Sequence, residues 1–105
     1  QISSQTYDTL RIVIGMVNDK DINGVLALLP QNATYYFTQA SIPRALPAHE
    51  MKTAALHFGL SGKTYNTVED AYIHALEESQ PNDFIFIGGS TFIVADLLKY
   101  LNRNS

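Results

Sequence analysis

The chain has 105 residues, a net charge of −3 with neutral histidines, and no cysteine. This length fits one ordinary domain that can bury a single core. Apolar residues make up 46% of the chain, which is typical of a soluble globular protein and favours no membrane partner. The basic residues are scattered, which disfavours nucleic-acid binding. The lack of cysteine excludes a disulfide framework and a thiolate metal site.

In the first half of the chain, strand-like runs alternate with helix-like spacing. Residues 11–16 read Arg-Ile-Val-Ile-Gly-Met, which predicts a strand buried on both faces. Apolar residues at helical spacing follow over 19–29, and an aromatic and β-branched run predicts a second strand over 33–38. A helix is predicted from Pro47 until Gly59, which is placed to cap it. The predicted apolar faces of the two helices are Ile22, Val25, Leu26 and Leu29, and Met51, Ala54, Ala55 and Phe58.

The second half repeats this alternation. A short polar strand is predicted over 63–66, and Thr67 then has the position of an N-cap before two acidic residues. The most hydrophobic strand is predicted over 83–87, and a closing helix follows it. The predicted faces of these two helices are Val68, Ala71, Ala75 and Leu76, and Val94, Leu97, Leu98 and Leu101.

Strands alternating with helices predict an α/β fold. We expect a single three-layer, Rossmann-like domain whose four-stranded sheet is mainly parallel and has helices on both faces. Ligands of such sheets bind at the carboxyl ends of the strands. The loops after the first and fourth strands are therefore the predicted site.

The loop after the fourth strand reads Gly88-Gly89-Ser90-Thr91. Its glycines let the backbone approach a ligand closely, and the following helix offers free N–H groups to a carboxylate or phosphate. The alternative is a serine N-cap after a tight turn, and the motif alone does not separate the two.

The loop after the first strand reads Asn18-Asp19-Lys20-Asp21. A cation at the N-terminus of a helix is electrostatically unfavourable, which suggests that Lys20 binds a ligand. The alternative is an exposed lysine neutralised by its flanking acids, with Asn18 or Asp19 as the N-cap.

Two other patterns fail as sites. Residues 57–64 end in Gly-Lys-Thr like a phosphate-binding loop, but His57 occupies the position of the first glycine and the segment follows a helix. His49, Glu50 and His57 lack the H-E-x-x-H spacing, so no metal site is expected. No G-x-S-x-G elbow supports a hydrolase.

Three stretches, IVIGMVNDKD, YYFTQASIPRALP and DFIFIGGSTFIVADLL, occur in this order. Together they resemble the C-terminal domain of folylpolyglutamate synthase/dihydrofolate synthase, a branch of the Mur ligase superfamily. The resemblance runs from Arg11 onward and implies a cytoplasmic, ATP-dependent amide ligase. In that family ATP phosphorylates a carboxylate of the pterin substrate or folate, and the amino group of glutamate attacks the acyl phosphate.

The resemblance also implies partners and site residues. ATP and Mg would be bound mainly by an N-terminal ATPase domain of a longer parent chain, over which this domain closes to help bind glutamate. By position, Lys20 would pair with one carboxylate of glutamate, and Gly89 with Ser90 would receive the other. Asp19 and Arg44 match family positions and are possible ligand-proximal residues. No residue of this chain is assigned a catalytic role.

One family feature is missing before Arg11, namely an Asp-Gly-Ala-His-Asn-like segment that contacts ATP. We therefore expect a chain that begins partway down the preceding helix, lacks the ATP-binding core and does not catalyse alone. The strand over 84–87 would then present an unpaired edge, which favours self-association. The alternatives are a stand-alone flavodoxin-like or receiver-like binding module, and a structural domain with no ligand site.

Overall fold

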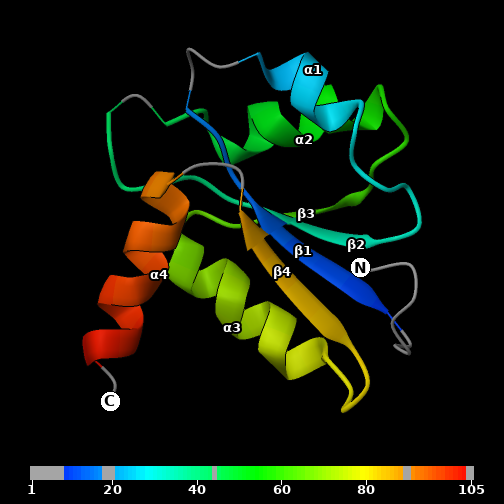
Figure 1. The fold of residues 1–105 in the computed structure, drawn as a ribbon. Helices are drawn as coiled ribbons and strands as arrows, with labels where there is room; N and C mark the ends of the chain where they lie inside the picture. The colour runs from blue at the N-terminus through cyan, green and yellow to red at the C-terminus, as the bar shows by residue number, and fades with distance from the viewer. Residues whose placement is uncertain (1–8, 18–20, 44, 89–90, 104–105) are drawn as a thin grey trace.

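The computed structural model of the chain describes residues 9–17, 21–43, 45–88 and 91–103. Strands and helices alternate along it, as Figure 1 shows. The elements in chain order are β1 (Leu10–Ile14), α1 (Ile22–Leu26), β2 (Thr34–Phe37), α2 (Ala48–Leu56), β3 (Gly62–Thr64), α3 (Val68–Glu78), β4 (Phe84–Gly88) and α4 (Thr91–Arg103). The predicted α/β class is confirmed.

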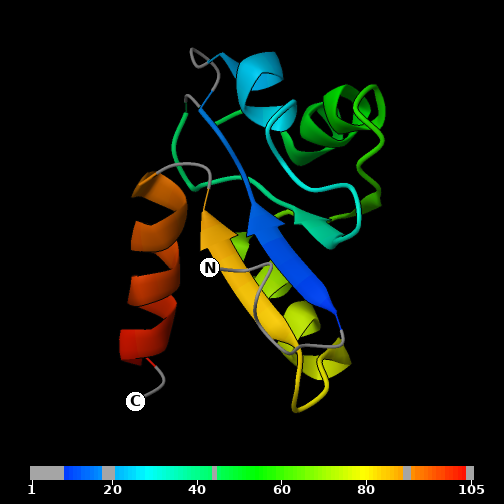
Figure 2. The same cartoon turned by 45° about the vertical axis from the view of Figure 1, so that its right-hand side comes forward.

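The strands form one parallel sheet in the order β3-β2-β1-β4. Ile12 of the inner strand β1 lies opposite Tyr35 of β2 on one side and Phe86 of β4 on the other. Helices α1 and α2 cover one face, and α3 and α4 lie on the other (Figures 1 and 2). The predicted mainly parallel sheet with helices on both faces is therefore confirmed, although β3 ends two residues before the predicted 66.

The face beneath α1 and α2 carries the largest apolar cluster. Ile12 and Phe37 point to this face from neighbouring strands, because side chains of a strand alternate between its two faces. Leu26 of α1 and both Met51 and Ala55 of α2 are fully buried against them. The remaining residues of the two predicted helix faces pack partly buried around this cluster: Ile22, Val25, Leu29, Ala54 and Phe58.

The opposite face packs against α3. Val13 and Tyr36 contact Ala71 and Ala75, whose small side chains let the helix lie close to the sheet. Leu76 is 45% exposed, so its predicted place on the buried side is wrong. It follows Ala75 by one residue, and a step of 100° around the helix carries it out of the contact.

Helix α4 turns a different face to the core from the one that its spacing predicts. Ile93 and Leu97 are buried, whereas Val94, Leu98 and Leu101 are 40%, 54% and 39% exposed. The prediction is thus correct only for Leu97. Two adjacent apolar rows run along this helix, and periodicity alone does not tell which row meets the rest of the domain.

β4 is the outermost strand next to β1, and its outer edge has no strand partner in the described part of the chain. Phe84 and Phe86 point to the face that α1 and α2 cover elsewhere, and they are 39% and 44% exposed. The expected unpaired edge of β4 stays a prediction beyond the described residues. Self-association through it stays a prediction.

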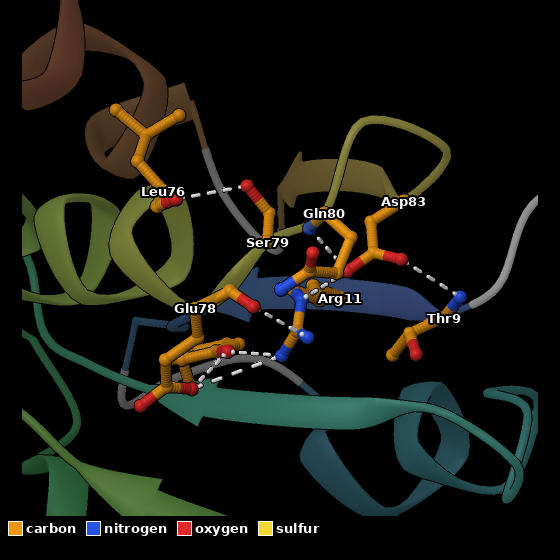
Figure 3. A network of polar contacts seen from close by, with 8 residues as sticks. Thr9, Arg11, Leu76, Glu78, Ser79, Gln80 and Asp83 are labelled. Carbon is orange, nitrogen blue, oxygen red and sulfur yellow. Dashed lines mark hydrogen bonds and ion pairs between the residues drawn. The ribbon is translucent and has the colours of Figure 1, made fainter.

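Polar side chains join the elements at the amino-terminal edge of the sheet (Figure 3). Arg11 Nε donates to Asp83 Oδ2 at 2.9 Å, and its Nη1 donates to the hydroxyl of Tyr36 at 2.8 Å. The Nη2 group donates to the backbone carbonyl of Glu78 at 2.9 Å. One arginine thereby fixes β1, β2, the end of α3 and the residue before β4.

Candidate functional site

The carboxyl ends of the parallel strands meet at one edge of the sheet, where ligands of such folds bind. The loops after β1 and β4 leave from this edge. All residues predicted for the site lie outside the described residues: Asp19, Lys20, Arg44, Gly89 and Ser90. Their roles stay predictions, and the structure describes the residues that precede and follow them in the chain.

β1 continues beyond its last residue as an extended segment that is held on both sides. The Gly15 N–H donates to the Gly88 carbonyl at 3.4 Å, which connects the ends of β1 and β4. On the other side, Val17 forms an antiparallel bridge with Ala45, and the Leu46 N–H donates to the Met16 carbonyl at 2.9 Å. The chain therefore leaves the sheet toward residue 18 from a fixed position.

Gly15 lies where β1, β2 and α4 converge. A Cβ atom at this position would lie 2.6 Å from the Thr38 carbonyl oxygen and 2.7 Å from Cδ1 of Ile93. Both distances are shorter than real contacts, so a larger residue would push the elements apart. The absence of a side chain brings the start of α4 close to the ends of β1 and β2, which is a role that the sequence pattern did not reveal.

Asp21 is the N-cap of α1, and its Oδ1 accepts a hydrogen bond from the Gly24 N–H at 3.2 Å. The predicted N-cap at Asn18 or Asp19 is therefore wrong, and the alternative of an exposed Lys20 neutralised by its flanking acids stays open. α1 is also only five residues long, against the helix predicted over 19–29. A helix this short has a small dipole, so the electrostatic argument for Lys20 loses most of its weight and the family pattern carries that assignment.

A hollow of about 370 Å³ lies between the start of α1 and α2 at this edge. Asp21 and Glu50 contribute carboxylates to its wall, and Leu46 and Ala54 contribute apolar surface. Two carboxylates suit a positively charged group rather than the carboxylate of a ligand. The described wall of this hollow therefore offers no positive charge to an anion.

Thr38 follows β2 and is completely buried. Its Oγ1 has no hydrogen-bond partner among the described residues. A buried hydroxyl without a partner costs roughly 1–3 kcal/mol. The residue lies in the stretch YYFTQASIPRALP that carries part of the resemblance, but nothing in that stretch indicated an unsatisfied buried group.

The segment that resembles a phosphate-binding loop is part of the framework. Gly59 has φ 76° and follows α2, in a conformation that favours glycine. Gly-Lys-Thr forms β3 itself, and a Cβ atom on Gly62 would overlap the Tyr35 carbonyl oxygen. These glycines serve the turn and the strand pairing. This agrees with the prediction that the segment is not a phosphate-binding loop.

The chain matches one protein-family model over residues 1–91, described as Mur ligase, glutamate ligase domain. The chain belongs to this family. The match favours the ligase interpretation over a flavodoxin-like or receiver-like module.

This glutamate ligase domain is similar to several folate enzymes. It is 31% identical over 91 residues to the dihydrofolate synthase/folylpolyglutamate synthase of Escherichia coli (strain K12), covering 86% of this chain and 21% of that protein. The structure of E. coli FolC in complex with DHPP and ADP matches 99% of this chain and 25% of its own, with TM-score 0.86 and 26% identity.

A further solved structure is a bifunctional folylpolyglutamate synthase/dihydrofolate synthase with Mn, AMPPNP and L-glutamate bound. It matches 90% of this chain and 22% of its own, with TM-score 0.79 and 28% identity. The chain thus spans about a fifth to a quarter of the length of these relatives.

The described ranges contain neither a metal-binding group nor a membrane-spanning helix. No group of three or more His, Asp or Glu side chains there is arranged to hold a metal ion. The helices of the same ranges are too short or too polar to span a bilayer.

Proposed function

We propose that this chain is the C-terminal, glutamate-binding domain of an ATP-dependent ligase that adds glutamate to dihydropteroate or to folates through an acyl phosphate. The single observation that carries the proposal is the match of residues 1–91 to the glutamate ligase family. A relative with 28% identity that has L-glutamate bound supports the choice of amino acid. The E. coli relative in complex with DHPP and ADP supports the choice of acceptor.

Glutamate carries two carboxylates and needs a partner for each. In the proposed site Lys20 pairs with one carboxylate, and the N–H groups of Gly89 and Ser90, just before α4, receive the other. Asp19 and Arg44 lie nearby in this proposal. The hydrogen bond between Gly15 and Gly88 supports it, because the two loops leave from adjacent strands.

Nucleotide and metal are bound mainly by an N-terminal ATPase domain in this proposal, and this chain alone does not catalyse. Relatives about four times as long, with ADP or with AMPPNP and Mn bound, support it. Specificity for dihydropteroate or folate would then reside outside this chain.

A titration tests the glutamate site in the chain itself. We expect L-glutamate to shift the backbone amide signals of Lys20, Gly89 and Ser90 in NMR spectra, with millimolar affinity. Lys20→Ala should weaken the affinity for glutamate about tenfold or more, because it removes a charged partner of a carboxylate. Lys52→Ala, on α2, is the matched control and should change nothing.

A second measurement, ADP formation by the longer enzyme in response to glutamate, is needed beside the titration to test the proposed function. If glutamate shifts none of these amides and the longer enzyme forms no ADP in response to glutamate, the proposal is wrong. If glutamate shifts the amides equally in Lys20→Ala and wild type, the domain binds glutamate but the role of Lys20 is wrong.

A further inference from the structure

Residues 41–46, which follow β2, connect α4 to the end of β1. At the α4 side, the Ser41 N–H donates to Asp96 Oδ2 at 2.7 Å, and the Ser41 hydroxyl donates to Asp96 Oδ1 at 2.9 Å. Both carboxylate oxygens thus hold one residue that is 55 positions away in the sequence. We call the described residues of 41–46 the brace.

At its other end the brace is bonded to the extension of β1. Ala45 bridges Val17, and the Leu46 N–H donates to the Met16 carbonyl at 2.9 Å. Lys20 comes three residues after Val17 in the sequence, and Ser90 directly precedes α4. The brace therefore ties together the two elements from which both proposed carboxylate partners extend.

Apolar side chains of α4 also pack against the brace. Ile42 and Ala45 pack against a buried cluster that includes Ile93 and Leu97 of α4. Dispersion contacts of this kind hold the segment near α4 but do not fix its position along the helix. The charged acceptor of Asp96 adds two directional bonds, each stronger than a bond between neutral groups.

We propose that Asp96 is a positioning residue for glutamate binding. By holding Ser41 it fixes the brace, and the brace sets the separation between the end of β1 and the start of α4. The inference rests on the proposed function, because a ligand with two anionic ends joined by a short chain needs this separation to be fixed. A displacement of about 1 Å in such a site can reduce activity by up to about 100-fold.

The substitution Asp96→Ala should leave the fold intact. Asp96 and Ser41 line a hollow of about 520 Å³, so water can reach the donors of Ser41 when the carboxylate is removed. Asp96→Asn keeps one acceptor oxygen and should rescue part of the effect. Glu77→Ala, which removes an exposed acid from α3, is the matched control for the change of charge.

The first measurement is backbone amide hydrogen exchange in this chain. We expect Asp96→Ala to speed exchange at Ser41 about tenfold or more and to shift the amide signals of Ile42 and Ala45. The second measurement is steady-state kinetics of the longer enzyme that carries this domain. We expect the KM for glutamate to rise about five- to tenfold, while kcat and the KM for ATP stay within about twofold.

Each result decides the inference. Unchanged exchange at Ser41 in Asp96→Ala would overturn it, because the carboxylate would then hold nothing. Faster exchange with an unchanged KM for glutamate would also overturn it, yet would leave the proposed function standing. If the wild-type enzyme shows no glutamate-dependent turnover, the proposed function fails and the inference falls with it. A raised KM that Asp96→Asn partly restores supports both.

Discussion

The Nε of Arg11 on β1 lies 2.9 Å from Oδ2 of Asp83, the residue before the edge strand β4. The same carboxylate accepts the backbone N–H groups of Thr9 at 3.1 Å and Gln80 at 2.9 Å. Asp83 thus closes the turn before β4 and holds β4 to β1 at the amino-terminal edge. In parallel sheets that edge lies opposite the ligand site, so we assign this cluster to stability.

Asp83 gives the fold a defined dependence on acid. The backbone N–H of Gln80, aided by Arg11 and Thr9, lowers the pKa of Asp83 from its ordinary value of 3.8. A carboxyl whose pKa is lower in the folded chain stabilises the fold above its unfolded pKa, and the effect is lost as the pH falls through the folded value. We expect Asp83→Asn to be less stable than wild type at neutral pH. As the pH falls below about 4, the variant should lose less stability than wild type does.

Urea denaturation over a pH series measures this. Asp70→Asn, on the exposed side of α3, is the control and should keep the wild-type acid dependence. A variant Asp83→Asn with the same stability profile as wild type would show that the cluster contributes nothing.

Tyr36 should make the stability of the fold depend on pH in the alkaline range. Burial and its hydrogen bond to Glu78 raise the pKa of Tyr36 to about 12. A group whose pKa is raised on folding stabilises the fold below its unfolded pKa, and the contribution is lost as the pH rises through the folded value. Tyr36→Phe should therefore lower the free energy of unfolding by about 1 kcal/mol at neutral pH. Between about pH 10 and pH 12 the gap to wild type should narrow.

Tyr72→Phe serves as the control for this measurement, because Tyr72 lies on α3 away from Arg11. A difference between Tyr36→Phe and wild type that stays constant up to the alkaline transition would contradict the assignment of the raised pKa to Tyr36.

Local pattern predicted much of this fold, and tertiary context decided the rest. The strands and the buried side of α2, with Met51 and Ala55, follow from residue type and period alone. Which apolar row of α4 is buried depended on where the helix packs, so Leu98 was misplaced. Pairs such as Ser41 with Asp96 join residues 55 positions apart, and no spacing rule indicates them.

Thr38 offers a test of an unsatisfied buried group. Its Oγ1 has no partner among the described residues, so removing the hydroxyl without changing the shape should relieve a cost. We expect Thr38→Val to raise the free energy of unfolding by about 1 kcal/mol in urea denaturation. Thr64→Val, on the exposed end of β3, is the control and should change stability little. A loss of stability in Thr38→Val would mean that the hydroxyl is bonded in solution.

Gly15 should tolerate no side chain. A Cβ atom there would lie 2.6 Å from the Thr38 carbonyl oxygen, a backbone atom that cannot rotate away. We expect Gly15→Ala to lower the free energy of unfolding by about 1–3 kcal/mol, measured by urea denaturation. Gly88→Ala is the matched control at the end of β4, because the atoms nearest to its Cβ atom would belong to the exposed ring of Phe86, at 3.0 Å and beyond, and this side chain can move. Equal stability of the two variants would show that the ends of β1 and β2 are not closely packed against α4, and the brace would then lose its support at this edge.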